Sequence, residues 1–283
     1  MGTLYVVATP IGNLNDFSPR AIKMLQEADY ILVEDTRQTI KLLNHFDIKN
    51  KMISYHKFNE KERTKSVIQD LNNGKNVALV SDAGTPCISD PGYILVKEAL
   101  ENGIKVLGIP GCSAVITALS ISGLDTASFS FYGFVPTENK QKKLLFDEIK
   151  TSKIKTKVIY ESPKRLIKLL KEIKSEIPGC VVSVCSELTK VHEKCIHGKI
   201  DDVLEKLEQD PNNSKGEYVI LISNDPEKKE NEKLSLEAMI IDEVVKNNCS
   251  LKDAINVINS KNVDISKKDI YNASLNLKNI LKR

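Results

Sequence analysis

Short apolar runs alternate with longer segments of mixed polarity over the first part of the chain. The apolar runs show little alternation of polar and apolar positions, which is typical of parallel strands buried on both faces. The longer segments have the length and patterning of helices. We therefore predict a parallel sheet covered by helices, with strands at residues 4–8, 30–33, 51–55, 77–81 and 106–109 and helices at 18–28, 36–46, 61–72 and 91–102.

A second set of elements follows a helix of small residues at 113–121. Two of its last strands adjoin with no helix between them, so we expect a mixed sheet in this part of the chain. The predicted strands are 129–134, 157–160, 180–185, 192–197 and 217–222, and the predicted helices are 140–149, 163–175 and 202–209.

A charged segment with a proline, residues 224–233, predicts a linker to a helical tail. The tail should contain helices at 235–247, 250–259 and 267–281, and the turn near 263–266 resembles a helix-turn-helix. It could contact nucleic acid or simply cap the core. The chain is thus expected to be an α/β protein with a parallel-sheet lobe (1–112), a mixed-sheet lobe (113–224) and a helical domain (234–283).

The charge of the chain is unevenly distributed, although its net value is only +3. Residues 138–174 contain 12 Lys/Arg and 5 Asp/Glu, which suits a polyanionic partner but also a solvated lysine-rich helix face. Cations in the first turn of a helix oppose its dipole, so Lys164 and Arg165 suggest a nearby phosphate, although exposure to solvent would also make them harmless. The candidate RNA-binding residues are Lys140, Lys142, Lys143, Lys164 and Arg165.

Neither a targeting segment nor a metal site is expected. The N-terminal apolar run is short and stops at Pro10, and no stretch reaches the roughly 18 apolar residues that span a bilayer, so we expect a cytoplasmic protein. The six cysteines are scattered. A zinc set of Cys180, Cys185, Cys195 and His197 lacks C-x-x-C spacing, and opposite strand parity separates the first two, so ordinary core cysteines are the favoured interpretation.

Candidate chemistry lies in the loops that follow the predicted strands, because ligands of parallel sheets bind at the carboxyl ends of strands. The most informative loop is 81–92 (SDAGTPCISDPG). Asp90 and Pro91 suit the start of a helix as N-cap and first residue. The small residues around Asp82 leave room for a ligand, and its carboxylate could face an ammonium or sulfonium. No G-x-G-x-x-G or phosphate-binding P-loop motif occurs.

Several of these loops together carry a resemblance to a known family. The segments are LYVVATPIGNL (4–14), EDTR (34–37), VSDAGTP (80–86), DPG (90–92), PGCSA (110–114), YGFVP (132–136), YES (160–162), ELTK (187–190) and KGE (215–217). In this order they resemble the ribosomal RNA small subunit methyltransferase I family of the tetrapyrrole methylase superfamily. Cys112 is a mild departure from the family pattern.

The resemblance implies a homodimer that binds S-adenosylmethionine (SAM) between two lobes and methylates the ribose 2′-hydroxyl of a cytidine in 16S rRNA at the decoding centre. Carried over residue by residue, the SAM-binding positions are Pro10, Ser81, Asp82, Ala83, Gly84, Ser113 and Ala114, with Tyr132 and Gly216 on the adenosine side. The sequence also leaves open a SAM-dependent methyltransferase of corrin biosynthesis and a non-catalytic RNA-binding protein of ribosome assembly.

A ribose hydroxyl is a weak acid, so a base or a nearby cation should help it lose its proton. Charged residues that directly follow predicted strands are the candidates for this catalytic role. They are Glu34, Asp35, Glu161, Glu187 and Lys190.

Overall fold

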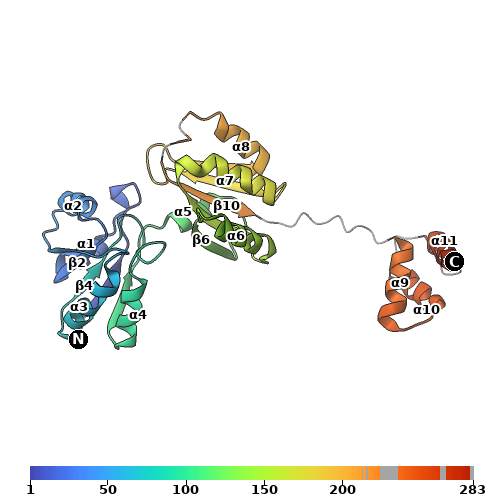
Figure 1. The fold of residues 1–283 in the computed structure, drawn as a ribbon, viewed down its shortest axis with the longest axis horizontal. Coiled ribbons are helices and arrows are strands. Elements are labelled where there is room, and N and C mark those ends of the chain that lie inside the picture. Colours follow the sequence, from blue (N-terminus) through green and yellow to red (C-terminus); the bar gives the residue numbers. More distant parts are fainter. Residues whose placement is uncertain (212, 215, 224–234, 262–265, 281–283) are drawn as a thin grey trace. The chain divides into compact units, whose positions relative to one another are not determined.

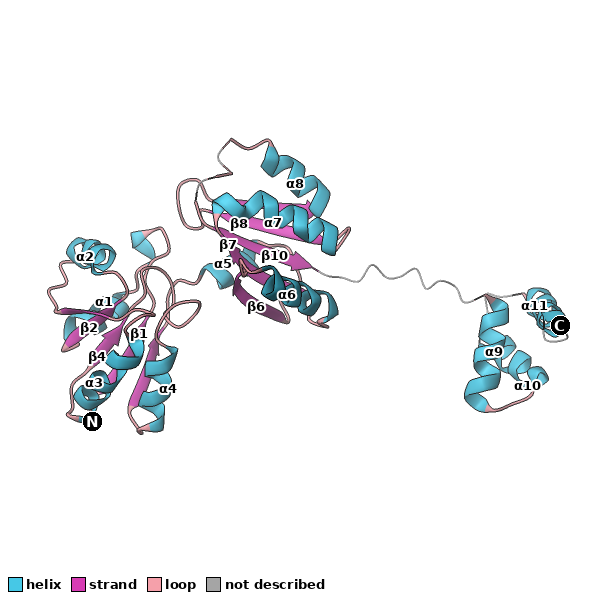
Figure 2. Cartoon of the chain, in the orientation of Figure 1, coloured by secondary structure: helices cyan, strands magenta, loops and turns pink. Residues whose placement is uncertain are grey.

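The computed structural model describes residues 1–211, 213–214, 216–223, 235–261 and 266–280 (Figure 1). They belong to two compact units, Met1–Asn224 and Asp225–Arg283. The first unit contains two separate five-stranded sheets, each flanked by helices (Figure 2). The last strand of the first sheet along the chain ends at Ile109, and the first strand of the second sheet begins at Phe129.

The first sheet is entirely parallel, as the unalternating apolar strands predicted. Its strands lie in the order β3 (Met52–Ser54), β2 (Tyr30–Val33), β4 (Val77–Leu79), β1 (Thr3–Val7) and β5 (Lys105–Ile109). Each strand starts and ends within two residues of its predicted bounds. Because β4, β1 and β5 are neighbours, the loops that follow these three strands emerge side by side.

Helices cover both faces of this sheet. Helices α1 (Pro19–Glu27) and α2 (Thr36–His45) pack on one face, where Leu25 and Leu43 meet Ile31 of the sheet. Helices α3 (Glu60–Asn72) and α4 (Tyr93–Glu101) pack on the other, where Leu71 and Leu95 are buried. Alternate residues of each strand enter the two clusters, which explains why the strands are apolar throughout.

The start of α4 differs from the prediction that Asp90 and Pro91 begin it. The N-cap is Gly92, at a φ of 131°, and the helix starts at Tyr93. Gly92 has no side chain that could cap the helix. A larger residue would not fit at this position, because a Cβ there would lie 2.7 Å from Leu79 Cδ2 and 2.8 Å from Cys87 Sγ. Asp90 is consequently free of the capping role.

The second sheet is mixed, as predicted. Its order is β6 (Phe129–Phe134), β7 (Thr156–Glu161), β10 (Tyr218–Ser223), β8 (Val181–Ser186) and β9 (Lys194–Lys199), with only the β6–β7 pair parallel. One face packs against α6 (Asn139–Thr151), α7 (Pro163–Glu176) and α8 (Ile200–Glu208). The other packs against α5 (Ala114–Ile121), the helix that connects the lobes.

The described part of the second unit forms three helices, α9 (Leu236–Asn247), α10 (Leu251–Lys261) and α11 (Lys267–Ile280). They enclose a small core that includes Ile240, Ile258 and Ile270. The start of α10 is capped by Ser250, because the Asp253 N–H donates to Ser250 Oγ at 3.2 Å and this hydroxyl donates to the Asp253 carboxylate at 2.6 Å. The predicted linker 224–233 and turn positions 263–265 lie outside the described residues.

Candidate functional site

Three loops at the carboxyl edge of the first sheet are joined by hydrogen bonds. Thr9, after β1, and Gly84, after β4, exchange two backbone hydrogen bonds of 2.8 and 3.0 Å. The Thr85 hydroxyl donates to the carbonyl of Cys112, after β5, at 2.9 Å. The predicted ligand-binding loops therefore form one connected surface.

Gly12 brings this surface against the second lobe. A Cβ on Gly12 would lie 2.6 Å from Lys190 Cγ and 2.9 Å from Thr189 Oγ1. Since real side chains do not approach so closely, glycine is required by the packing of the loop after β1 against the 187–190 loop. Gly12 therefore allows a close backbone approach between the lobes.

A cavity of about 460 Å³ lies between the lobes. Its volume falls within the range of small-molecule sites, which is about 300–1,000 Å³. The first lobe contributes Ile11, Glu34, residues 82–85 and residues 88–90, and α5 contributes its first turn. The second lobe contributes Phe134, residues 160–163 and residues 217–219.

The cavity wall is strongly acidic. Glu34, Asp82, Asp90, Glu161 and Glu217 all line it, and no lysine, arginine or histidine is among the described lining residues. Burial, and then the charge of Glu34, raises the pKa of Asp90 to about 7. Burial, and then the charge of Asp82, also raises the pKa of Glu34. The site therefore favours a cationic ligand or a proton, either of which relieves the repulsion.

The negative charge of Glu161 is compensated by neighbouring hydrogen-bond donors. Its Oε1 accepts hydrogen bonds from Arg165 Nε and from the Ser162 N–H, both at 2.7 Å. The side chain of Glu161 is only 2% exposed. The ion pair with Glu161 stabilises Arg165 in the first turn of α7, so no bound phosphate is needed to explain this cation.

An aromatic surface forms another part of the wall. Tyr160 packs between Phe131 and Phe134, with ring centroids 4.9 and 5.4 Å away. Burial raises the pKa of Tyr160 to about 12, so its hydroxyl keeps its proton at neutral pH. Phe134 is 57% exposed and offers a flat apolar face to a planar group.

The cavity gathers five of the nine predicted SAM-binding residues: Asp82, Ala83, Gly84, Ser113 and Ala114. The other four are not part of its wall. Pro10 and Ser81 are buried, and Tyr132 packs against the core of the second lobe. Gly216 lies directly beside the Glu187 carboxylate, where a Cβ would be 2.5 Å from Oε1.

Of the predicted catalytic residues, Glu34 and Glu161 line the cavity. Asp35 caps α2 and binds Arg37, and it lies in an adjoining depression. Glu187 and Lys190 form an ion pair of 2.9 Å in the loop against Gly12 and are not part of the cavity wall. The structure therefore brings only two of the five into one site.

Asp90 is the site residue that the sequence did not single out. It lies in a loop where Cys87 and Ser89 adopt left-handed backbone angles, with φ of 71° and 67°. Such conformations are costly for residues other than glycine and collect at functional sites. Gly92 was the available signal, because a glycine before a helix can itself be the N-cap and leave a preceding carboxylate free.

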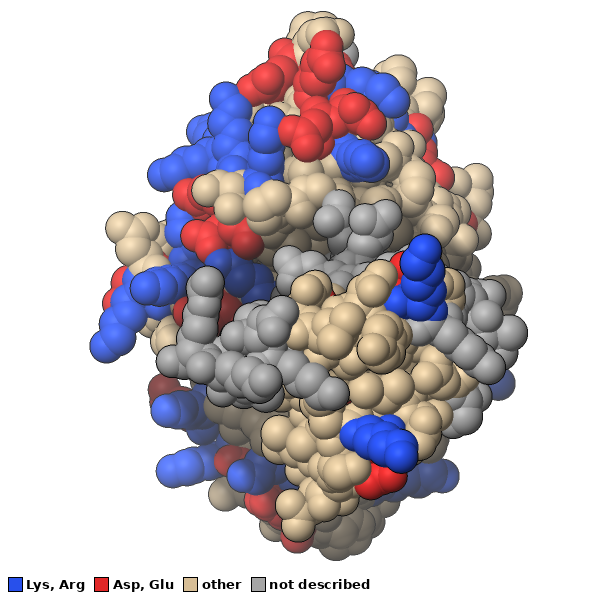
Figure 3. Space-filling view, turned by 90° about the vertical axis from the view of Figure 1, so that its right-hand side faces the viewer, with Lys and Arg blue, Asp and Glu red and all other residues tan. Residues whose placement is uncertain are grey.

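The predicted RNA-binding residues divide into two groups. Lys142 binds Glu172 at 2.8 Å and Arg165 binds Glu161, so both charges are already compensated. Lys140, Lys143 and Lys164 are exposed, and the described part of the chain offers them no ion-pair partner. Basic and acidic side chains also lie interspersed on the face that Figure 3 draws.

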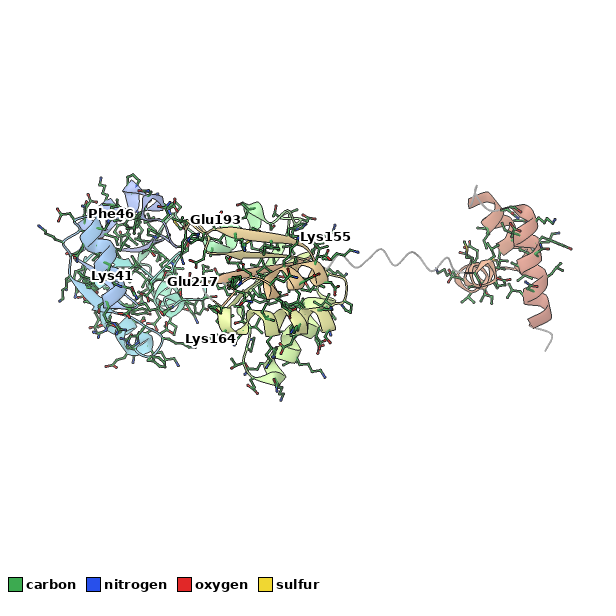
Figure 4. All side chains as sticks on the ribbon, turned by 90° about the horizontal axis from the view of Figure 1, so that it is seen from above. Lys41, Phe46, Lys155, Lys164, Glu193 and Glu217 are labelled. Atoms are coloured by element: carbon green, nitrogen blue, oxygen red, sulfur yellow. The ribbon has the colours of Figure 1, made fainter. Side chains whose placement is uncertain are left out.

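Among the exposed predicted RNA-binding residues, Lys164 lies next to the cavity wall. It follows the cavity-lining residue Pro163, and Figure 4 places it with Glu217 at the end of the second lobe that faces the first. Lys155 lies at the opposite end of that lobe in the same view.

Cys180 and Cys185 are buried in the core, whereas the other four cysteines are partly exposed. Cys180 and Cys185 enter clusters on opposite faces of the second sheet, as their parity predicted. Cys185 and Cys195 are paired across β8 and β9 as free thiols, with Sγ atoms 2.8 Å apart. Among the described residues, no group of three or more His, Cys, Asp or Glu could hold a metal ion, and no helix has the length and apolarity to cross a membrane.

Comparison with known proteins agrees with the resemblance read from the loops. The family model of tetrapyrrole (corrin/porphyrin) methylases matches residues 3–204. Among solved structures, a diphthine synthase has a TM-score of 0.58 at 14% identity over 78% of this chain and 90% of its own. The uroporphyrin-III C-methyltransferase of Thermus thermophilus, solved with S-adenosyl homocysteine, has a TM-score of 0.53 at 18% identity, covering 79% and 98%. At these identities the structures establish the fold.

Curated relatives are much closer in sequence. A protein of Halalkalibacterium halodurans named ribosomal RNA small subunit methyltransferase I is 44% identical over 96% of this chain and 94% of its own. Proteins of the same name from Buchnera aphidicola and Haemophilus influenzae are 40% and 37% identical over 95% and 91% of this chain, and over 94% and 91% of their own lengths. The chain therefore belongs to the tetrapyrrole methylase family, within the group of ribosomal RNA small subunit methyltransferases I.

Proposed function

We propose that the chain transfers a methyl group from SAM to the ribose 2′-hydroxyl of a cytidine in 16S rRNA at the decoding centre. The observation that supports it most is the acidic cavity between the lobes, combined with relatives that are named for methylation of small-subunit rRNA. The finer part of the proposal, the nucleotide and its 2′-oxygen, rests on the resemblance of the loop motifs.

The cavity residues fit a sulfonium donor. Asp82 and Glu34 provide negative charge for its positive groups, and the small residues Ala83, Gly84 and Ala114 let a ligand approach the backbone closely. Gly84 lines the cavity at a φ of 83°, a backbone conformation that favours glycine. The exposed face of Phe134 offers a stacking surface for a purine. SAM would supply a methyl group that is already activated for transfer.

The protein's contribution is then mainly alignment and proton acceptance. Holding a hydroxyl in line with a reacting carbon contributes up to about 7–11 kcal/mol to rate acceleration. The hydroxyl must also lose a proton. Asp90 suits this role because its carboxyl lines the cavity with a pKa of about 7, close to a working pH near neutrality.

Glu34 is the second candidate acceptor, since its pKa is raised by the same acidic surroundings. Glu161 is less suited, because Arg165 and the Ser162 N–H occupy its Oε1. We propose that Asp90 and Glu34 share one proton and that Glu161 positions the start of α7.

The same cavity disfavours the corrin alternative. An acidic macrocycle would bring several carboxylates against Glu34, Asp82 and Asp90, the wall carboxylates that have no ion-pair partner in the described part of the chain. A nucleotide needs to insert only its ribose hydroxyl, while its phosphates stay at the cavity mouth.

The test is transfer of tritiated methyl from SAM to small ribosomal subunits that lack the modification, followed by nucleoside analysis. We expect label in 2′-O-methylcytidine, and none when a precorrin is the acceptor. Label in a base, or in no RNA at all, refutes the proposed reaction. SAM binding by calorimetry separates the enzyme from a non-catalytic RNA-binding protein, which would give no heat.

The Asp90→Asn, Glu34→Gln and Glu161→Gln variants test the residue roles in single turnovers with saturating SAM. We expect Asp90→Asn to lower the rate by about 10²–10⁴-fold, the usual contribution of a general base. Glu27→Gln, which alters an exposed carboxylate on α1 outside the cavity wall, is the matched control and should leave the rate unchanged. The homodimer and the cytoplasmic location remain proposals, and sedimentation velocity tests the first.

A further inference from the structure

A second depression adjoins the cavity between the lobes. It is lined by residues 34–37, Ser54, residues 56–58 and Asp82, and we call it the Phe58 vestibule. It shares Glu34 and Asp82 with the cavity, so the two spaces meet at these carboxylates. A polymeric ligand that places one of its units in the cavity would therefore place the neighbouring unit on the vestibule.

The vestibule exposes an unusual side chain. Phe58 is 95% exposed, although phenylalanine is a residue type that proteins usually bury. Its ring leans on His56, with centroids 6.0 Å apart at 67°. His56 Nδ1 is buried and has no hydrogen-bond partner among the described residues. The vestibule thus presents a bare aromatic face beside a histidine whose buried Nδ1 has no described partner.

The loop that carries Phe58 is held in place. Tyr55, only 1% exposed, anchors its start through a 2.8 Å hydrogen bond between its hydroxyl and Thr64 Oγ1. The Asn59 side chain closes its other end, accepting from the His56 N–H at 2.8 Å and donating to the Ser54 carbonyl at 3.2 Å. A platform fixed in this way loses little conformational entropy on binding.

Lys57 and Arg37 line the vestibule together with the carboxylates of Glu34, Asp35 and Asp82. Lys57 is exposed, and the described residues give it no ion-pair partner. Arg37 is held by Asp35 through Nε and Nη2, yet its side chain is 86% exposed. The ion pair with Asp35 fixes the orientation of the planar guanidinium, and its Nη1 has no hydrogen-bond partner among the described residues.

We propose that the Phe58 vestibule binds a nucleotide of single-stranded RNA next to the methylated one, with its base stacked on Phe58 and a backbone phosphate near Lys57 and Arg37. The proposal rests on the proposed function and adds that the nucleotide next to the methylated one must be free of base pairing. Bases in a duplex are already stacked and do not offer a free face, whereas unpaired bases stack readily on aromatic side chains.

The chain contains no tryptophan, which permits a direct test. Phe58→Trp keeps an aromatic platform and introduces a single fluorophore. A short single-stranded RNA oligonucleotide of mixed sequence should quench it, and the same oligonucleotide annealed to its complement should not. Leu100→Trp, at a 60% exposed site near the end of α4, is the control and should respond to neither.

Binding of the oligonucleotide should weaken about 5- to 100-fold in Phe58→Ala and stay near wild type in Phe58→Trp. Lys57→Ala should lower the slope of log affinity against log salt by about 0.7, the value for one contact to a single strand. The affinity for SAM should be unchanged in all these variants. Because Phe58 is exposed, none of these substitutions removes core packing.

Equal quenching by single strand and duplex, equal quenching of Leu100→Trp, or unchanged RNA affinity in Phe58→Ala would each overturn the proposal. A shift of Phe58→Ala from dimer to monomer with RNA affinity intact would overturn it too, since a second copy of the chain would then be what covers the ring. The oligonucleotide experiments measure binding alone. If the wild type fails to transfer methyl groups, the proposed function is refuted. That result can be told apart from a failure of RNA to bind at the vestibule, which the oligonucleotide experiments measure separately.

Discussion

Replacing Asp90 with asparagine should stabilise the protein, and the gain should grow with pH. The carboxyl of Asp90 has its pKa raised from 3.8 to about 7 by burial and then by Glu34. The unfolded chain therefore binds fewer protons than the native chain between these pH values, and native stability falls as pH rises through this window. Asparagine resembles the protonated acid and avoids the loss.

The size of the effect follows from the same values. The difference between 3.8 and about 7 corresponds to about 4 kcal/mol, at about 1.36 kcal/mol for each tenfold change in proton affinity. Asp90 is only partly buried, and solvent screens such a group, so we expect a gain of about 2 kcal/mol at pH 8. From pH 5 to pH 8 the gain should increase by about 1 kcal/mol, because part of the loss is already present at pH 5.

Urea unfolding of the wild type and Asp90→Asn at pH 5, 6.5 and 8 measures this difference, with Glu27→Gln as a control that should show no such trend. A gain that is independent of pH, or a variant less stable than the wild type at pH 8, would refute the reasoning. The same substitution should slow methyl transfer, so stability and activity are expected to change in opposite directions. If the variant is more stable and fully active, Asp90 is not the proton acceptor, and Glu34 becomes the remaining candidate for that role.

Three further outcomes follow from close contacts and charges. Gly12→Ala should lower the free energy of unfolding by about 1–3 kcal/mol in denaturant titrations, as overpacking does, whereas Gly108→Ala, with no atom within 4 Å of its added Cβ, should change little. Lys164→Gln should lower the salt dependence of subunit binding by about one unit of log–log slope, and an unchanged slope would remove it from the RNA surface. Mild oxidation should link Cys185 to Cys195, so thiol titration of the denatured product should find four of the six thiols, and six would contradict the pairing.

The local parts of the fold were readable from the sequence because they depend on local patterns. The strand 30–33 is predicted with its observed bounds, since an apolar run between helical segments specifies a buried strand. The order of strands in each sheet was not predicted, because pairing joins residues far apart in the chain. The compensation of Lys142 by Glu172 on another helix was hidden for the same reason.

The candidate site was predictable where glycine and small residues mark a loop, as at 82–84 and 113–114. It was not predictable where a residue has a plausible local role, as Asp90 had in capping a helix. The Glu161–Arg165 pair lies between those cases. Its i, i+4 spacing was visible in the sequence, but only the burial of Glu161 shows that the pair is internal.

The two backbone hydrogen bonds between Thr9 and Gly84 have a thermodynamic consequence. They tie the ligand-binding loops of the first lobe to neighbouring strands, so the first-lobe wall of the cavity is set when the parallel sheet forms. Heating should then abolish donor affinity and melt this sheet in one transition. Reciprocally, donor present at a hundredfold excess over its dissociation constant should raise the stability of that transition by about 2.7 kcal/mol.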